Sequence, residues 1–241
     1  MLHTELDNDI KTIRIEYGKA NAIDDLLLDN LIAETKDLSV KGLTITGAGD
    51  CFSAGLNLPL LVDYDRQQMY NLMHKFHHFQ LDLLQAPFPV VAAINGHCIA
   101  GGFIMALNCD YRIARTGPFK LGMNEMILGI SLPPIATARI EQLHNSQIMK
   151  LGRQGQLVDP DQALAAGLIH RLVNESDLYS AASNYINNFN QNIKLHANSE
   201  LIKFLSIDFE SKYKPFLDIW FSDQARRHIN RLIARLNRSN A

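Results

Sequence analysis

Residues 87–114, PFPVVAAINGHCIAGGFIMALNCDYRIA, decide the fold of this chain. The run PVVAAIN is apolar up to its last residue, which is typical of a strand that is covered on both faces. Gly96 turns the chain, Gly101 and Gly102 open a helix that runs to Asn108, and YRIA is another short strand. Because polar residues and glycines interrupt this apolar tract, it is predicted to form a buried strand, a turn and a helix rather than a membrane span.

Strands and helices also alternate on both sides of this tract. Upstream, a period-two pattern predicts a strand at 12–17, and an apolar run predicts another at 42–47, after a helix that begins near Asp24 or Asp25. A longer helix is predicted for residues 65–85, with one apolar stripe made by Leu72, Phe76, Phe79 and Leu83. Downstream, helices dominate and end in an amphipathic stripe made by Ile229, Leu232, Ile233 and Leu236. We therefore expect an α/β core over residues 1–173 and a helical C-terminal region over residues 174–241.

Composition places the chain among globular proteins. Its 241 residues are 47% hydrophobic and 20% charged, which fits a packed core and excludes a disordered chain. The net charge of −2 gives no bulk field for nucleic acid or for an anionic membrane. The three cysteines have no CxxC spacing, and the first residues are polar and acidic, unlike a secretory signal. We therefore expect a cytoplasmic protein with reduced thiols, no membrane span and no nucleic-acid partner.

Two charged patterns are interpreted as surface features. His74, His77 and His78 share a helical face, but no carboxylate accompanies them at the spacing of a zinc motif. We interpret them as a solvent-facing stripe and predict no metal site. Five basic side chains near the end of the sequence are interpreted as the solvated face of an amphipathic helix or as a subunit contact: Arg226, Arg227, Arg231, Arg235 and Arg238.

Two glycine-centred segments have the residue types of a site that uses main-chain donors. One is FSAGLNL at 52–58 and the other is NGHCIAGG at 95–102, and each follows an apolar strand. Glycine lets a backbone approach a ligand closely, and the N–H groups at the start of a helix are free to donate. Two such donors aimed at one point form an oxyanion hole. On spacing alone, an ordinary strand-to-helix turn remains the better interpretation of both segments.

A third segment, LGMNEMILG at 121–129, contains a single carboxylate, Glu125, in an otherwise apolar run. An exposed loop glutamate is the simplest interpretation of this pattern. Met123, Met126, Ile127 and Leu128 indicate dry surroundings instead, where the loss of solvation raises the pKa of a carboxylic acid. A carboxylate with a raised pKa suits a general base that works near neutral pH.

Taken in order, these segments resemble the enoyl-CoA hydratase/isomerase (crotonase) superfamily. FSAGLNL is similar to the family's F-x-A-G-x-D/N-L segment, with Asn57 where Asp is commoner, and residues 87–114 match its second glycine segment. LGMNEMILGI is similar to the segment that carries the acidic catalyst. GKANAID and QALAAGLIHRLV resemble two further family segments, so the resemblance covers about residues 13–173. It implies an α/β fold with a crotonase-like (ββα)-repeat spiral core and a helical tail.

The resemblance also implies roles for particular residues. The oxyanion hole would use the backbone N–H groups of Leu56 and Gly101, which would bind the thioester carbonyl of an acyl-CoA, and Glu125 would be the acid–base catalyst. The CoA part would rest on the backbone of the first glycine segment and on the early loop, at Lys19, Ala20, Ala54, Leu56, Asn57, Leu58 and Gly101. The acyl pocket would be lined by Leu61, Ile104, Leu128 and Leu132.

Position 104 separates the reactions that the family carries out. Hydratases of the family have a second glutamate there, which holds water together with the first, whereas this chain has Ile104. One glutamate suffices for a Δ3,Δ2-enoyl-CoA isomerase, and GMNE and CDYRIA also resemble those enzymes. Other reactions that need one acid stay open, namely weak hydration, thioester hydrolysis or decarboxylation, as does a non-catalytic acyl-CoA-binding role. The resemblance further implies no cofactor beyond the CoA of the substrate, and a homotrimer or a hexamer.

Overall fold

The computed structural model describes residues 1–238, apart from the side chains at 191–193, 195, 196 and 237. The strands are β1 (Leu2–Asp7), β2 (Ile10–Ile15), β3 (Gly42–Gly47), β4 (Cys51–Ser53), β5 (Val90–Ile94), β6 (His97–Ile99), β7 (Tyr111–Arg115), β8 (Leu121–Gly122) and β9 (Arg171–Val173). The α-helices are α1 (Asp25–Thr35), α2 (Leu58–Leu61), α3 (Arg66–Gln85), α4 (Gly101–Asn108), α5 (Pro134–Gln142), α6 (Ser146–Gln154), α7 (Pro160–Ala165), α8 (Leu178–Asn187), α9 (Gln191–Leu205), α10 (Phe209–Trp220) and α11 (Asp223–Arg238). Short 3₁₀ turns are η1 (Glu125–Leu128) and η2 (Glu175–Asp177).

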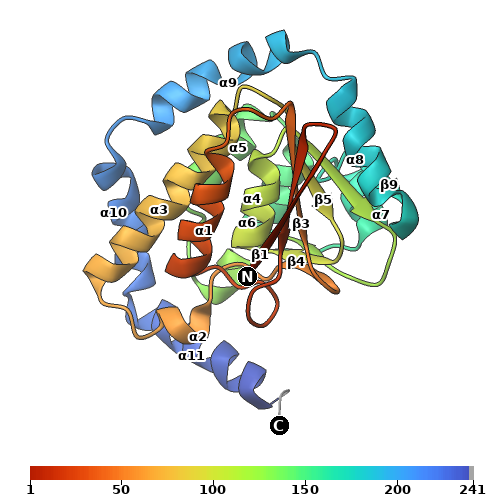
Figure 1. The fold of residues 1–241 in the computed structure, drawn as a ribbon. Coiled ribbons are helices and arrows are strands. Elements are labelled where there is room, and N and C mark those ends of the chain that lie inside the picture. Colours follow the sequence, from red (N-terminus) through yellow and green to blue (C-terminus); the bar gives the residue numbers. More distant parts are fainter. Residues whose placement is uncertain (239–241) are drawn as a thin grey trace.

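The strands form two sheets, and the chain adds strands to each of them in turn (Figure 1). The larger sheet has the order β1-β2-β3-β5-β7-β9 and is parallel except for the β1–β2 pair, and the smaller sheet has the parallel order β4-β6-β8. Each successive pair β3–β4, β5–β6 and β7–β8 therefore adds one strand to each sheet before the chain enters helix. This repetition is the expected (ββα) spiral, and it confirms the predicted fold class.

Strand β5 lies in the middle of the larger sheet and is buried on both faces, as its apolar run predicted. Val91 and Ala93 pack against α8 on one face, whereas Val90, Ala92 and Ile94 belong to the main core on the other. Such two-sided burial requires apolar side chains at every position, because successive residues of a strand point to opposite faces.

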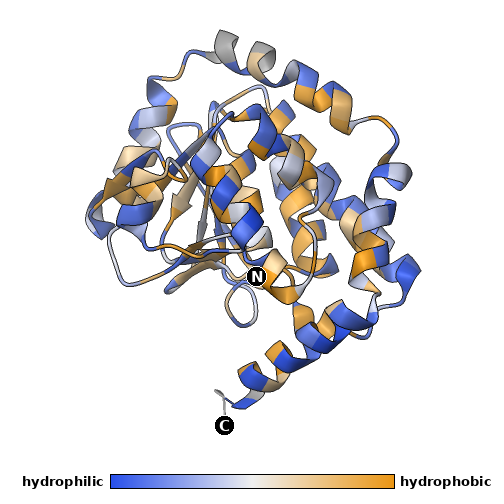
Figure 2. Cartoon of the chain, turned by 180° about the vertical axis from the view of Figure 1, so that it is seen from behind, coloured by the Kyte–Doolittle hydropathy of each residue, from blue (hydrophilic) through white to orange (hydrophobic). Residues whose placement is uncertain are grey.

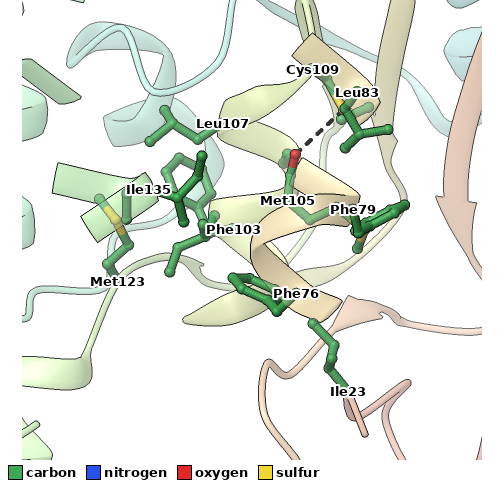
Figure 3. Packing of buried hydrophobic residues seen from close by; sticks show 14 of the residues in the cluster. Ile23, Phe76, Phe79, Leu83, Phe103, Met105, Leu107, Cys109, Met123 and Ile135 are labelled. Carbon is green, nitrogen blue, oxygen red and sulfur yellow. Dashed lines mark hydrogen bonds between the residues drawn. The ribbon is translucent and has the colours of Figure 1, made fainter. Parts of the chain in front are cut away.

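Helix α4 lies inside the main core, and all eight of its residues are buried. In Figure 3, Met105 faces Phe79 of α3, while Phe103 and Leu107 lie toward Ile135 of α5. A helix that is apolar all round needs neighbours on every side, and α3, α5 and the strands β4 and β6 supply them. Packing on all sides fixes the position of the helix start at Gly101.

The C-terminal helices wrap around the body of the molecule (Figure 1). Helix α9 is held by Lys194, whose Nζ lies 2.7 Å from Asp110 Oδ2 and donates to the carbonyl oxygens of Leu83 and Phe88 at 3.0 and 2.9 Å. Helix α11 is amphipathic, with apolar and polar residues alternating along it in Figure 2. Its Arg226 donates to the carbonyl oxygens of Val62 and Tyr64, so this arginine forms a contact within the chain.

The interpretation of the three histidines as a solvent-facing stripe is wrong for one of them. His74 and His78 are exposed, but His77 is 1% exposed, and its ring nitrogens lie 3.0 Å from the Tyr213 hydroxyl and 3.2 Å from the Leu205 carbonyl oxygen. Burial lowers the pKa of His77 to about 4, so it is neutral at physiological pH. The sequence pattern could not reveal this, because α10 covers α3 only in the folded chain.

The sequence predicts neither a metal site nor a membrane span. Within residues 1–238, no group of three or more histidine, cysteine or acidic side chains is arranged to hold a metal ion. The helices in the same part of the chain are too short or too polar to cross a bilayer.

We expect Asp110→Asn to lower the free energy of unfolding by about 3 kcal/mol, because it leaves the buried ammonium of Lys194 without a counter-charge. Urea unfolding monitored by circular dichroism measures this change. Asp218→Asn is the matched control: Asp218 also bridges basic side chains, Lys214 and Arg66, but at the surface, where such pairs contribute less than about 1 kcal/mol. Equal losses in the two variants would contradict the stabilising role assigned to the buried pair.

Candidate active site

One pocket collects residues from both glycine segments, from the third segment and from the C-terminal helices. Its empty space is about 600 Å³, including its mouth. Apolar side chains dominate the lining, and Glu125 is the only ionisable residue among the described residues that form it. The full lining is Ala54, Leu56, Leu58, Met73, Phe76, Ile99, Ala100, Gly101, Ile104, Asn124, Glu125, Leu128, Ile130, Pro133, Phe216, Trp220 and Leu232.

Backbone hydrogen bonds join the first glycine segment to Ile23 and leave one N–H group of this segment without a partner among the described residues. The Ile23 N–H donates to the Gly55 carbonyl oxygen at 2.7 Å, and the Asn57 N–H donates to the Ile23 carbonyl oxygen at 2.8 Å. In extended backbone, successive N–H groups point to opposite sides. The carbonyl of Gly55 and the N–H of Asn57 both face Ile23, so the N–H of Leu56 points away from Ile23. This N–H makes no hydrogen bond within the described residues.

The second segment presents the first N–H of helix α4. Ala100 precedes this helix with φ +51° and ψ −125°, a conformation that L-residues rarely adopt. The torsion ψ of Ala100 sets the direction of the next peptide N–H, which belongs to Gly101. No carbonyl within the helix can accept from this first position, so the donor is available to a ligand. The strain of the order of 1–3 kcal/mol at Ala100 is of the kind found at functional sites.

The two segments touch at their glycines. A Cβ built on Gly55, where φ is +84°, would lie 2.8 Å from both Ala100 Cβ and Gly101 N. A Cβ built on Gly102 would lie 2.4 Å from the carbonyl oxygen of Ser53. Only glycine allows this approach, and as a result Leu56 N lies 3.6 Å from the Cβ position of Gly101. The two free N–H groups are therefore neighbours at one wall of the pocket.

Glu125 begins the 3₁₀ turn η1 and is 8% exposed. Its Oε2 atom is buried and has no hydrogen-bond partner among the described residues. Burial raises the pKa of this carboxyl from 4.5 to about 7, and a hydrogen bond from its own backbone partly opposes the shift. A carboxylate with one oxygen free and a pKa near 7 can both accept and return a proton at neutral pH.

The dry surroundings of Glu125 were predicted correctly, but not all of the residues that cause them. Met126 and Ile127 are 47% and 64% exposed, so they do not desolvate the carboxylate. Met123 is buried, and Leu128 lines the pocket. The remaining shielding comes from pocket walls far away in sequence, which a local pattern cannot reveal.

The structure brings together most of the site residues expected from the sequence. Ala54, Leu56, Leu58, Gly101, Ile104, Glu125 and Leu128 all line the one pocket. Leu61 and Leu132 do not line it, which corrects the expectation for them: Leu61 is fully buried in the core, and Leu132 is half-buried against it. Lys19 and Ala20 are exposed on the early loop, outside the lining residues. The Asn57 side chain turns inward and donates to Asp24 Oδ2 at 3.1 Å.

The inner wall of the pocket was missed by sequence reasoning. Met73 and Phe76 of α3, together with Phe216 and Trp220 of α10, are each no more than 3% exposed and line the pocket. Leu232 of α11 completes this wall. The stripes on α3 and α11 were visible in the sequence, but nothing local indicates that they meet around a cavity.

Comparisons with known proteins identify a family and several relatives that the chain resembles. The family model described as enoyl-CoA hydratase/isomerase matches residues 5–214. Human mitochondrial enoyl-CoA delta isomerase 1 is 33% identical over 61% of the chain and 49% of its own length. The alpha subunit of the fatty acid oxidation complex from Shewanella halifaxensis is 32% identical over 72% of the chain, but over 24% of its own length. The chain thus spans about a quarter of that subunit and about half of the human isomerase.

A hydratase and a solved structure extend the comparison. The short-chain-enoyl-CoA hydratase of Clostridium acetobutylicum is 30% identical over 76% of the chain and 72% of its own length. The crystal structure of human mitochondrial Δ3-Δ2-enoyl-CoA isomerase superposes with a TM-score of 0.92 at 24% identity, covering 100% of the chain and 99% of that structure. This superposition establishes the crotonase fold, independently of any reaction.

We expect Glu125→Gln to stabilise the protein at alkaline pH, by up to about 3 kcal/mol at 1.36 kcal/mol per pKa unit. The folded carboxyl, with its pKa near 7, keeps its proton while the unfolded one, with its pKa near 4.5, loses it. The contribution of Glu125 to stability is therefore highest below pH 4.5, falls as pH rises toward 7 and then stays low. Glutamine has no charge to bury and avoids this loss.

Unfolding in urea at pH values from about 4 to 8 tests this expectation. Glu141→Gln, the same substitution at an exposed position, is the matched control. A stability difference between Glu125→Gln and wild type that stays constant over this range would refute the assignment of the raised pKa to Glu125.

Proposed function

The chain belongs to the enoyl-CoA hydratase/isomerase family, and from this premise we propose that it is a Δ3,Δ2-enoyl-CoA isomerase. The observation that carries the proposal is the pocket with one buried carboxylate, whose Oε2 has no partner among the described residues, and with Ile104 in place of a second carboxylate. CoA enters as part of the substrate, and the reaction uses no further cofactor.

In the proposed reaction Glu125 moves one proton over two carbon atoms. Its carboxylate removes a proton from C2 of a 3-enoyl-CoA, and the C2–H electron pair spreads over the thioester and the C3=C4 double bond as a dienolate. The N–H groups of Leu56 and Gly101 hold the thioester oxygen, where negative charge develops. The same carboxylic acid then delivers its proton to C4, which leaves a double bond between C2 and C3. No atom is gained or lost.

The pocket chemistry favours this reaction over hydration. Addition of water by the two-carboxylate route needs a second acid–base group to orient the water molecule, and isoleucine at position 104 cannot accept a proton. Ile104 is 1% exposed and lines the same pocket as Glu125, so it also excludes water from the dienolate. The burial of Glu125, with Oε2 lacking a partner among the described residues, argues against a binding-only role, because burying a carboxylate oxygen without a partner costs stability and adds nothing to thioester binding.

We expect wild-type protein to convert 3-enoyl-CoA into conjugated 2-enoyl-CoA, seen as rising thioester absorbance. Glu125→Gln should lower kcat by about 10³-fold, because it removes the only acid–base group among the described residues that line the pocket, while the Kd for a saturated acyl-CoA changes less than about threefold. Loss of absorbance when 2-enoyl-CoA is the substrate would indicate hydration and overturn the isomerase assignment. Equal loss of binding and turnover in Glu125→Gln would overturn the role of Glu125.

The pH profile provides a second test. Because Glu125 must be ionised to take the first proton, kcat/KM should rise about tenfold per pH unit at low pH and level off above about 7. Initial rates at substrate concentrations well below KM measure this profile. A plateau that extends down to pH 5 would mean that the base has an ordinary carboxylate pKa.

A further inference from the structure

Asp24 is a buried carboxylate beside the first glycine segment that the proposed reaction does not use. It is 4% exposed and caps helix α1 by accepting the N–H of Leu27 at 3.1 Å. The Tyr17 hydroxyl lies 2.9 and 3.0 Å from its two oxygens, and Asn57 Nδ2 donates to Oδ2 at 3.1 Å. Within the described residues, no lysine or arginine forms an ion pair with Asp24; Lys75 pairs with Asp25 and Asp29.

The Asp24–Asn57 contact acts on the same short piece of backbone that carries the Leu56 N–H. Ile23, next to Asp24, accepts from the Asn57 N–H and donates to the Gly55 carbonyl. The side-chain hydrogen bond from Asn57 to Asp24 is therefore a third hydrogen bond, or tie, between the same two backbone segments. The three ties lie on either side of Leu56, and together they fix the direction of its N–H.

The chemistry of this tie requires an amide at position 57. The oxygens of Asp24 accept every hydrogen bond that this side chain makes among the described residues, and Asn57 supplies one of the donors. An aspartate at 57 would place two carboxylate oxygens about 3 Å apart, and such a pair stays in contact only while it shares a proton. The partners of Asp24 are donors without charge, so none of them offsets a second negative charge.

We propose that the hydrogen bond between Asp24 and Asn57 is a positioning element that aims the Leu56 N–H into the pocket, and that an amide is required at position 57 because this hydrogen bond needs a donor opposite the carboxyl of Asp24. The inference rests on the proposed function for its kinetic readout. Asp24 and Asn57 are positioning residues, since they act through the backbone of Leu56.

Two tyrosines and one lysine lie near the Asp24–Asn57 pair. Tyr17 bonds Asp24 directly, and Tyr64 bonds the neighbouring Asp25 through its hydroxyl at 2.8 Å. Lys75 from α3 lies 3.2 Å from Asp25 and 2.8 Å from Asp29. Both tyrosines have pKa values raised by burial and by the nearby carboxylates, so neither ionises near neutral pH.

The test compares wild type, Asn57→Asp and the double variant Asp24→Asn/Asn57→Asp. In the single variant the tie holds at low pH, where the two carboxylates share a proton, and opens at high pH. We expect kcat to fall at least tenfold below wild type near pH 8.5, with a smaller change in KM and a smaller loss near pH 6, since one oxyanion donor contributes about 10²–10³-fold. A kcat loss that does not depend on pH would overturn the proposal.

The double variant restores one donor and one acceptor with their positions exchanged. The amide introduced at position 24 keeps an oxygen for the N–H of Leu27, because asparagine caps helices as well as aspartate does. Its nitrogen then donates to the carboxylate introduced at position 57. We expect kcat of the double variant to return to within about threefold of wild type across the pH range. Failure of this rescue in a variant that unfolds at the wild-type temperature would overturn the proposal.

An infrared measurement that needs no turnover distinguishes this inference from the proposed function. A saturated acyl-CoA labelled with carbon-13 at the thioester carbonyl reports, by its infrared stretch, the hydrogen bonds that the bound carbonyl receives. We expect the shift to lower frequency seen with wild type to shrink in Asn57→Asp near pH 8.5 and to return in the double variant. An absent isomerase activity with this spectral pattern intact would overturn only the proposed reaction. Equal spectra for all three proteins would overturn the positioning role.

Discussion

The contact between Gly55 and the start of helix α4 is the constraint on which the rest of the site depends. The backbone at Gly55 comes so close to Ala100 and Gly101 that a single extra carbon atom would collide. This approach sets the two free N–H groups beside each other, and the buried frame around them keeps them there. The smaller sheet places β4 next to β6, and α3 and α5 hold α4 from both sides. Main-chain donors held this way lose little freedom when a ligand arrives.

The opposite end of α4 is stabilised by positive charge. Arg139 Nε donates to the carbonyl oxygen of Leu107 at 3.1 Å, and Arg112 Nη1 lies 3.4 Å from the carbonyl oxygens of Leu107 and Cys109. Both arginines are buried, and burial lowers the pKa of Arg112 to about 10, which leaves it charged at neutral pH. Cations at a helix C-terminus complement its dipole. One helix thus ends on two guanidinium groups and begins at the point where the substrate oxygen is proposed to bind.

The regular elements and the site loops could be predicted from the sequence for local reasons. Residues 90–94 form a strand covered on both faces, and α4 spans the residues expected from its two glycines. The short strands β4, β6 and β8 were not predicted, because two or three residues carry no measurable period. Contacts with residues more than a hundred positions away in the sequence fix the places of His77 and Trp220, and no local pattern encodes such contacts. The exposure of Met126 and Ile127 shows the converse, that an apolar run need not be buried.

The wall that Phe216 and Trp220 add to the pocket has a consequence for the nascent chain. During synthesis, the ribosome releases the glycine segments and Glu125 long before α10, so the main-chain donors can be assembled while one side of the cavity is still open. In that interval Met73 and Phe76 present apolar surface without their final cover, which is the condition under which chains of this size associate wrongly. Docking of α10 and then of α11, which adds Leu232, ends the exposure and completes the binding cavity, so the molecule becomes competent for substrate only when this apolar surface is covered.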